Sequence, residues 1–421
     1  MRDKLSGWDL LTWRLGFEDK GIVPLVGSQI TVEGHVDFLT ILEIIQRAVD
    51  EHDVLRLALT KEEFPTLQTL THFELRDCVQ VLHNHVNPAQ AALRMATNEF
   101  SMNHYRADVP LWRLFVVHSD NETLLFPFLH HAIADGRTAL ELVLRLCGES
   151  STIEVTPGHS NGYAIKAILD DIFKSPVSIF EKVAPALFNL NSLVALSPRH
   201  TLPNFSKRSF RDEVVQFSVP REVLRDKAHA LSLSIHDMSV ALTLRIIQTL
   251  EHNMQVPESN SIRVNVPVAT KQMDSLNRLL IARLFIEGHD FEDIAVNYRT
   301  HFQNWKSQPS LIVYSTALEA VSKVSQIDLT SFATTSDVTV SSLPKVSKSL
   351  SLAGHEVLSL WPLVPSMGSA FNVTSIGLND YQYYTLSYDV ATRVDHVILR
   401  KTIREVLEKN IGVVPNFQQT V

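Results

Sequence analysis

Hydrophobic residues recur along this chain with two different spacings, which predict two kinds of secondary structure. A spacing of three and four residues predicts helices, and continuous or alternating apolar runs predict strands. The predicted helices cover residues 38–49, 140–147, 237–250 and 397–408, and the predicted strands cover 55–59, 123–129, 262–268 and 383–389. Because both halves of the chain mix helices and strands, we expect an α/β protein built from two α/β sandwiches packed side by side.

Two prolines fall inside predicted strands. Proline lacks the N–H group that a strand ladder needs, so Pro127 is expected at a sheet edge or at a bulge. Pro267 is expected to end the strand that begins at residue 262.

Turn-forming residues are concentrated between two apolar blocks at 197–204, Ser-Pro-Arg-His-Thr-Leu-Pro-Asn. We therefore expect a connector at 197–210 that separates an N-terminal subdomain, 1–196, from a C-terminal subdomain, 211–421. The apolar segment 184–196 precedes the connector. It is expected to form a core or tunnel-wall helix rather than a helix that docks on a membrane surface.

Composition limits the class of protein. With 421 residues, 45% of them hydrophobic and 20% charged, the chain can bury two cores. A net charge of -8 argues against nucleic-acid binding, which normally needs a basic surface. Cys78 and Cys147 lie in apolar contexts, which predicts buried free thiols and a reducing compartment. Because we find neither a signal-peptide pattern nor an apolar stretch of roughly 20 residues, we expect a cytoplasmic protein without a transmembrane segment.

The strongest functional signal is the segment 130–136, His-His-Ala-Ile-Ala-Asp-Gly, which joins a predicted strand to a predicted helix. A neutral imidazole can take a proton from a hydroxyl or an amine and return it to a leaving group. Two consecutive residues at a strand end point in different directions, so only one histidine can face a shared reaction centre. We interpret His131 as the candidate general base and His130 as its supporting partner.

The aspartate and the glycine of this segment each allow more than one role. Asp135 could orient His131, cap the following helix or meet a buried arginine, and we prefer the arginine. Gly136 suits a tight turn that needs a positive φ or a close approach by a substrate. The two histidines and Asp135 could also bind a metal. Because the chain offers only a loose second pair of histidines as further ligands, we expect no metal site.

The segment 130–136 resembles the HHxxxDG motif of the superfamily of chloramphenicol acetyltransferase, peptide-synthetase condensation domains, plant BAHD acyltransferases and wax-ester synthases. Its residues are most similar to those of the wax-ester synthase and polyketide-associated acyltransferase branches. Weaker blocks resemble other family motifs in the same order and cover nearly the whole chain; they lie at 5–9, 51–56, 110–113, 234–238 and 383–389. The DFGWG motif of BAHD enzymes has no match, and 340–344 replaces the asparagine-containing block of wax-ester synthases.

The resemblance implies an acyltransferase whose two chloramphenicol-acetyltransferase-like subdomains form a pseudo-dimer with an interdomain tunnel. The acyl group passes from a CoA or carrier-protein thioester to a hydroxyl or, as the second choice, an amine, with no further cofactor. His131 deprotonates the acceptor, which attacks the thioester directly, so no nucleophilic serine is required. The family pattern also pairs Asp135 with Arg56 in a structural salt bridge, and Arg113 and Arg137 are the alternative partners.

The oxyanion of such a reaction needs a hydrogen-bond donor. The amide of Gly136 or a hydroxyl of Ser341 or Ser342 could supply it, although the two serines also suit a turn before Pro344. Five other histidines are expected at the surface or in structural hydrogen bonds; they are His118, His236, His289, His355 and His396.

A second functional hypothesis belongs to another class. The chain could be a catalytically silent, condensation-like protein that binds a carrier protein or scaffolds an assembly of secondary metabolism. The intact His131, Asp135 and Gly136 favour the enzyme. We expect a monomer whose partners are a small-molecule acceptor, an acyl thioester and, for a protein-bound donor, an acyl carrier protein.

Overall fold

The computed structural model describes most of the chain outside one long central gap. The described residues are 3–5, 7–17, 22–83, 86–119, 121–148, 211–256, 261–269, 279–307, 336–346 and 349–418. The predicted helix at 184–196 and the predicted connector at 197–210 lie outside these residues.

The N-terminal half is built on a six-stranded sheet of order β12-β13-β2-β7-β6-β5, in which only β5 and β6 pair in parallel. Its strands are β2 (Leu25–Glu33), β5 (Val79–Val81), β6 (Trp112–His118), β7 (Glu122–His130), β12 (Ser351–Leu352) and β13 (His355–Leu363). Its helices are α1 (Gly7–Phe17), α2 (Phe38–Glu51), α3 (Pro88–Phe100) and α4 (Gly136–Leu146). A small sheet of order β1-β4-β3 adds β1 (Asp3–Lys4), β4 (Thr66–Thr69) and β3 (Leu57–Leu59).

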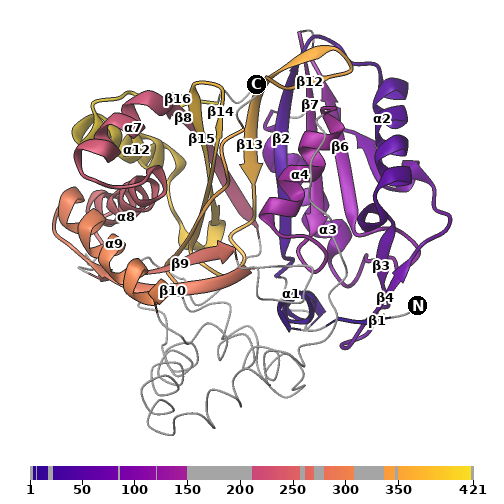
Figure 1. Ribbon diagram of the computed structural model, residues 1–421, viewed down its shortest axis with the longest axis horizontal. Coiled ribbons are helices and arrows are strands. Elements are labelled where there is room, and N and C mark those ends of the chain that lie inside the picture. Colours follow the sequence, from indigo (N-terminus) through magenta and orange to yellow (C-terminus); the bar gives the residue numbers. More distant parts are fainter. Residues whose placement is uncertain are drawn as a thin grey trace, which may run out of the picture.

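The C-terminal half is built on a seven-stranded sheet of order β10-β9-β11-β14-β15-β8-β16. Its strands are β8 (Asp212–Pro220), β9 (Ser261–Ala269), β10 (Leu279–Glu287), β11 (Val338–Ser342), β14 (Phe371–Leu378), β15 (Tyr381–Asp389) and β16 (Asn416–Phe417). Its helices α7 (Arg221–Ala230), α8 (Ile235–Asn253), α9 (Phe291–Ser307) and α12 (His396–Ile411) cover the face of the sheet that points away from the N-terminal half (Figure 1). Two α/β sandwiches therefore stand side by side, as the sequence predicts.

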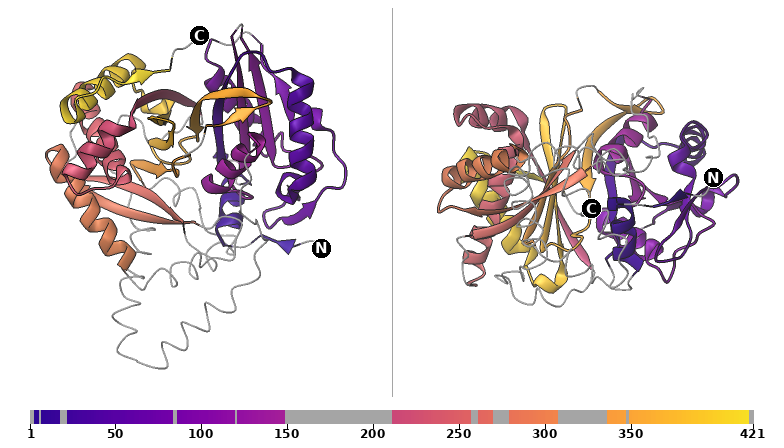
Figure 2. Two further views of the ribbon diagram at one scale, coloured as in Figure 1. Left: turned by 45° about the horizontal axis from the view of Figure 1, so that its top comes forward. Right: turned by 60° about the horizontal axis from the view of Figure 1, so that its bottom comes forward.

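One segment of the C-terminal half crosses into the N-terminal sheet. Strand β13 pairs antiparallel with β2, with Leu360 opposite Ile30 and Leu363 opposite Gly27. Figure 2 shows this segment reaching from the C-terminal body to the N-terminal sheet. Its side chains Leu360 and Trp361 are buried in the N-terminal core. The predicted division at 197–210 does not include this exchange, because strand pairing between distant segments leaves no signal in local periodicity.

Strand β7 carries Pro127 in the interior of the sheet, so the predicted edge position is wrong. The expected bulge is absent as well, because Gly27 pairs with Phe128 and Ile30 with Leu125 in one unchanged register. Pro127, which lacks an N–H, lies where this ladder is interrupted between those two pairs. Pro267 does not end its strand either, because β9 continues to Ala269.

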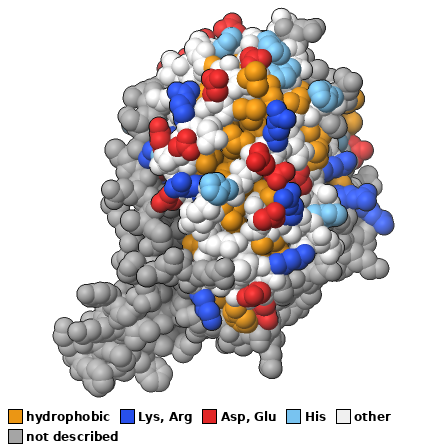
Figure 3. All heavy atoms as spheres, turned by 90° about the vertical axis from the view of Figure 1, so that its right-hand side faces the viewer, with side chains coloured by type: hydrophobic (Ala, Val, Ile, Leu, Met, Phe, Trp, Pro, Cys, Tyr) orange, Lys and Arg blue, Asp and Glu red, His pale blue; other side chains and the backbone are white. Residues whose placement is uncertain are grey.

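The described residues contain no single helix that is both long and apolar enough to span a membrane; α7 and α8 meet that test only together, across a bend of 95°. On the face that carries α2, acidic and basic side chains are interspersed with hydrophobic ones, and no basic stripe runs across this face (Figure 3). The two cysteines, Cys78 and Cys147, are buried and free, as predicted. Burial raises the pKa of the Cys78 thiol to about 12, so this thiol stays protonated.

Candidate active site

The HHxxxDG segment forms the turn between β7, which ends at His130, and α4, which begins at Gly136. The backbone of the turn is tied to neighbouring elements. The N–H of His131 donates to the carbonyl oxygen of Pro24 at 2.8 Å, and the N–H of Ile133 donates to that of His130 at 3.1 Å. The two histidines therefore leave the strand at a fixed point.

His130 is a core residue. Its ring lies 5.6 Å from the ring of Trp13 and 5.9 Å from that of Phe100, and its Nδ1 accepts a hydrogen bond from the N–H of Ala132 at 3.1 Å. Burial, with a smaller contribution from the charge of His131, lowers the pKa of His130 to about 3. The imidazole is therefore neutral with its hydrogen on Nε2, and its Nδ1 stabilises the turn by accepting the hydrogen bond from Ala132.

His131 faces the other way and contributes to the wall of a cavity of about 330 Å³. Both halves of the molecule line this cavity. Helices α1 and α4 and strands β2 and β7 supply the N-terminal side, together with Asp135 and Gly136. Strands β9, β11 and β14 supply the C-terminal side. The structure thus brings His131 to the space between the halves, and it separates the two histidines as predicted.

Asp135 is the N-cap residue of α4. Its carboxylate accepts a hydrogen bond from the N–H of Thr138 at 2.8 Å, which is the capping role considered beside the preferred arginine pair. The predicted salt bridge between Asp135 and Arg56 is wrong. Arg56 pairs instead with Asp53, a neighbour within the same 3₁₀ turn. The carboxylate partner of this guanidinium is thus a neighbour in the chain, and only the fold reveals that choice.

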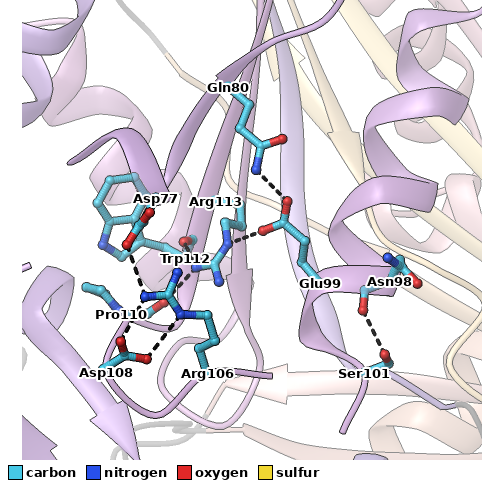
Figure 4. Close-up of polar contacts among 10 residues, drawn as sticks. All are labelled: Asp77, Gln80, Asn98, Glu99, Ser101, Arg106, Asp108, Pro110, Trp112 and Arg113. Atoms are coloured by element: carbon cyan, nitrogen blue, oxygen red, sulfur yellow. Dashed lines mark hydrogen bonds and ion pairs between the residues drawn. The ribbon is translucent and has the colours of Figure 1, made fainter. Parts of the chain in front are cut away.

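The two alternative arginines also have carboxylate partners. Arg113 on β6 pairs with Glu99 of α3, whose other carboxylate oxygen accepts from the side chain of Gln80 at 2.6 Å (Figure 4). Arg113 further donates to the carbonyl oxygens of Pro110 and Trp112, so it ties α3 to the start of β6. Arg137 reaches Glu141 one helical turn on, at 3.4 Å.

Gly136 approaches the C-terminal half closely. A Cβ atom added here would lie 3.1 Å from Cδ2 of Leu343. The φ angle of Gly136 is not positive, so the predicted alternative of a left-handed turn is wrong. The neighbour that a side chain at this position would crowd is a residue of the opposite half.

The two predicted serines lie at the end of β11, and both contribute to the cavity wall. They are strand residues, which corrects the alternative of a turn before Pro344. Ser341 pairs with Thr374 and Ser342 with Ser375 of the parallel strand β14. The structure therefore places His131, Gly136, Ser341 and Ser342 around one cavity, while Arg56 pairs elsewhere.

A polar wall of the cavity was missed by the sequence analysis. Nε of Arg283 donates to Asn265 at 3.1 Å, and the side-chain nitrogen of Asn265 donates to Ser336 at 2.8 Å. Ser369 lies 2.6 Å from both Ser336 and Thr339. The signal was present in β9, where Arg263, Asn265 and Pro267 alternate with apolar residues, because alternate residues of a strand share one face.

Among the described residues, no three His, Cys, Asp or Glu side chains converge as metal ligands. His236, expected at the surface or in a structural hydrogen bond, is half-buried and hydrogen-bonded in the C-terminal half. Tyr298, which the sequence analysis did not single out, is one of its partners.

Neither a family model nor a curated protein sequence matches this chain. Solved structures match it over nearly its whole length. The wax ester synthase/diacylglycerol acyltransferase from Marinobacter aquaeolei VT8 is 14% identical, has a TM-score of 0.62, and is matched over 98% of this chain and 100% of its own. The first condensation domain of the calcium-dependent antibiotic synthetase, in complex with substrate analogue 3a, is 13% identical with a TM-score of 0.66, and 99% of each chain is covered.

A third match is a mutant starter condensation domain of rhizomide synthetase in complex with C8-CoA and Leu-SNAC. It is 14% identical with a TM-score of 0.63, and 96% of this chain and 93% of that chain are covered. The chain has the fold of the chloramphenicol-acetyltransferase-like condensation superfamily. The predicted fold is thereby confirmed, and identities of 13–14% carry the comparison no further than the fold.

Proposed function

We propose that this protein is an acyltransferase that moves an acyl group from a thioester to a hydroxyl acceptor, with His131 as the general base. The observation that supports this proposal is the position of His131 in a cavity lined by both halves of the molecule. Donor and acceptor bound in such a cavity are held near one imidazole. Binding both raises their effective concentration at the reacting atoms.

The reaction needs one base and one oxyanion donor. His131 takes the proton of the acceptor hydroxyl, and the acceptor oxygen attacks the thioester carbonyl carbon. The tetrahedral oxyanion then collapses, the C–S bond breaks, and the imidazolium returns the proton to the leaving thiolate. No covalent enzyme intermediate forms.

The composition of the cavity wall fits the two substrates. The N-terminal side is mainly apolar, with Leu11, Leu140 and Val143, and suits an acyl chain. The C-terminal side carries Asn265, Thr339 and other polar groups, and suits a polar acceptor. CoA or an acyl carrier protein delivers the acyl group in this proposal, and an amine is the second choice of acceptor.

The test is acceptor-dependent thiol release. The protein is incubated with acyl-CoA and acyl-pantetheine thioesters of increasing chain length and a panel of alcohols and amines, and the acylated product is identified by mass spectrometry. His131→Ala should lower kcat by about 10² to 10⁴-fold, because general-base assistance contributes that much. The exposed His289 provides a matched control, and His289→Ala should retain full activity.

Two results would contradict the proposal. The first is that no thioester releases thiol in response to any acceptor, which favours the silent carrier-protein-binding or scaffold hypothesis. The second is full turnover by a His131→Ala variant that retains the wild-type circular dichroism spectrum and melting temperature.

A further inference from the structure

Three side chains of the C-terminal half form a line that ends at the cavity. The hydroxyl of Tyr298 on α9 lies 2.7 Å from Nε2 of His236, and Nδ1 of His236 lies 3.0 Å from Oγ of Ser342. Ser342 is the last residue of β11 and contributes to the same cavity wall as His131. Three elements that are distant in the sequence thus converge on one hydroxyl.

The position of His236 is fixed from two sides. It is the second residue of α8, whose first turn is locked by reciprocal hydrogen bonds between Ser234 and Asp237. The rings of Tyr298 and Phe302 lie 5.9 Å and 5.8 Å from its imidazole. Packing of this kind holds an imidazole in one orientation.

The hydrogen-bond partners determine which nitrogen of His236 carries the hydrogen. Burial lowers the pKa of His236 and raises the pKa of Tyr298, so the imidazole is neutral and the phenol keeps its hydrogen. Within the described part of the chain, Nε2 of His236 is the hydrogen-bond partner of the Tyr298 hydroxyl. We assign the hydroxyl as the donor, because its buried hydrogen would otherwise lack an acceptor. The hydrogen of a neutral imidazole then resides on Nδ1, which donates to Ser342.

Ser342 therefore accepts two hydrogen bonds. One comes from His236, and the other comes from the hydroxyl of Ser375 on β14, at 3.2 Å. A serine hydroxyl has two acceptor lone pairs and one hydrogen. With both lone pairs occupied, the hydrogen of Ser342 is available to a group in the cavity.

We propose that Tyr298 and His236 are positioning residues that fix the hydroxyl of Ser342 as a hydrogen-bond donor toward the cavity. This inference rests on the proposed acyl transfer, in which that hydroxyl meets the carbonyl oxygen of the thioester as it becomes an oxyanion. A donor that is already oriented needs no reorganisation when charge develops. In this tautomer His236 cannot accept the hydrogen of Ser342, so Ser342 is not a nucleophile and no acyl-serine forms.

The test is a double-mutant cycle on kcat and KM. Ser342→Ala should lower kcat by about 10²-fold or more, as the loss of an oxyanion donor does. Tyr298→Phe retains the ring and removes one hydrogen bond, so it should lower kcat by roughly fivefold to tenfold and leave KM within twofold. In the Ser342→Ala background Tyr298→Phe should have no further effect, and Ser342→Thr should restore part of the activity.

A matched control exists in the same core. The hydroxyl of the buried Tyr384 lies 2.8 Å from that of Ser239, which belongs to the same helix as His236. Neither Tyr384 nor Ser239 lines the cavity. Tyr384→Phe should lower the melting temperature about as much as Tyr298→Phe and leave kcat within twofold. This comparison separates a loss of positioning from a loss of packing.

Each possible result decides the inference. Acyl transfer that depends on His131 but is unchanged in Tyr298→Phe overturns it and leaves the proposed function standing, and absence of acyl transfer in the wild-type protein overturns both. An acyl adduct on Ser342, or an NMR spectrum of ¹⁵N-labelled histidine that places the His236 hydrogen on Nε2, also overturns it. The Nδ1–H tautomer, lost in Tyr298→Phe, is the expected result.

Discussion

Gly136, the first residue of α4, lies directly against Leu343, the residue that follows Ser342 at the end of β11. A Cβ atom at position 136 would be 3.1 Å from Cδ2 of Leu343. The start of α4 and the end of β11 both contribute to the cavity. This contact therefore joins the helix that follows the His131 turn to the residue next to Ser342.

Adding a side chain at this contact should impair activity more than stability. Gly136→Ala keeps an ordinary backbone conformation and needs a shift of only a few tenths of an ångström by Leu343, so the free energy of unfolding should change by less than about 1 kcal/mol. Gly136→Val should lower kcat further, because its larger side chain displaces the end of β11. Thermal melts and kcat are measured together. Adding Leu343→Ala to Gly136→Val should restore part of the rate, and no restoration would contradict the role of this contact.

The buried His130 should make the protein less stable as the pH falls. Its pKa of about 3 in the folded state lies below the ordinary 6.5, so the unfolded chain takes up the proton first. Stability is therefore fully present above pH 6.5 and should fall below it by about 1.4 kcal/mol per pH unit. Urea unfolding from pH 7.5 to 4.5 measures this slope. His130→Asn retains an acceptor for the N–H of Ala132, and its free energy of unfolding should fall less steeply with decreasing pH. Equal slopes in the variant and the wild-type protein would show that His130 does not titrate in this way.

Asp135 and Arg56 should contribute to stability independently. Loss of the cap in Asp135→Ala should cost about 1 kcal/mol, and Asp135→Ser, which retains a capping oxygen, should cost less. Arg56→Ala breaks a pair with Asp53, whose side chain is 80% exposed, and should cost less than about 1 kcal/mol. The double variant Asp135→Ala/Arg56→Ala should be additive within about 0.5 kcal/mol in chemical denaturation. A larger coupling energy would indicate that the two side chains interact.

Gly27 should not tolerate a side chain. A Cβ atom there would overlap a ring carbon of Phe128 and lie 2.6 Å from the carbonyl oxygen of Pro127, at the last pair before the interruption of the β2–β7 ladder. Gly27→Ala should cost about 1 to 3 kcal/mol through overpacking. Gly16→Ala is the matched control, because its nearest atom is 3.4 Å away and alanine favours the helix α1. Equal melting temperatures of the two variants would contradict this explanation.

Much of the secondary structure follows from local patterns. The helix predicted at 38–49 is α2, the helix predicted at 237–250 is α8 with its Ser234 cap, and the strand predicted at 123–129 is β7. Buried residues recur at helical spacing in α2, whereas β7 is an almost continuous buried run, and both patterns are visible in the sequence itself. The strand predicted at 55–59 is only partly correct, because a 3₁₀ turn occupies residues 53–56 and β3 begins at Leu57.

The candidate site could be predicted only in part. The separation of His130 and His131 follows from the alternation of side chains at a strand end, and the motif points to His131. The partner of Arg56 could not be found, because a motif states which residues occur and not which carboxylate lies nearest in space. Tyr298 and the link from His236 to Ser342 were missed for the same reason, since that link joins α8, α9 and β11.

The element types, the mixed α/β class and the strand-to-helix turn at 130–136 follow from the sequence, because each depends on residues that are neighbours in the chain. Three features follow only from the tertiary structure: β13 joins the N-terminal sheet, Leu343 lies against Gly136, and Ser342 meets His236. These contacts join segments separated by a hundred residues or more, so no local pattern of the sequence determines them.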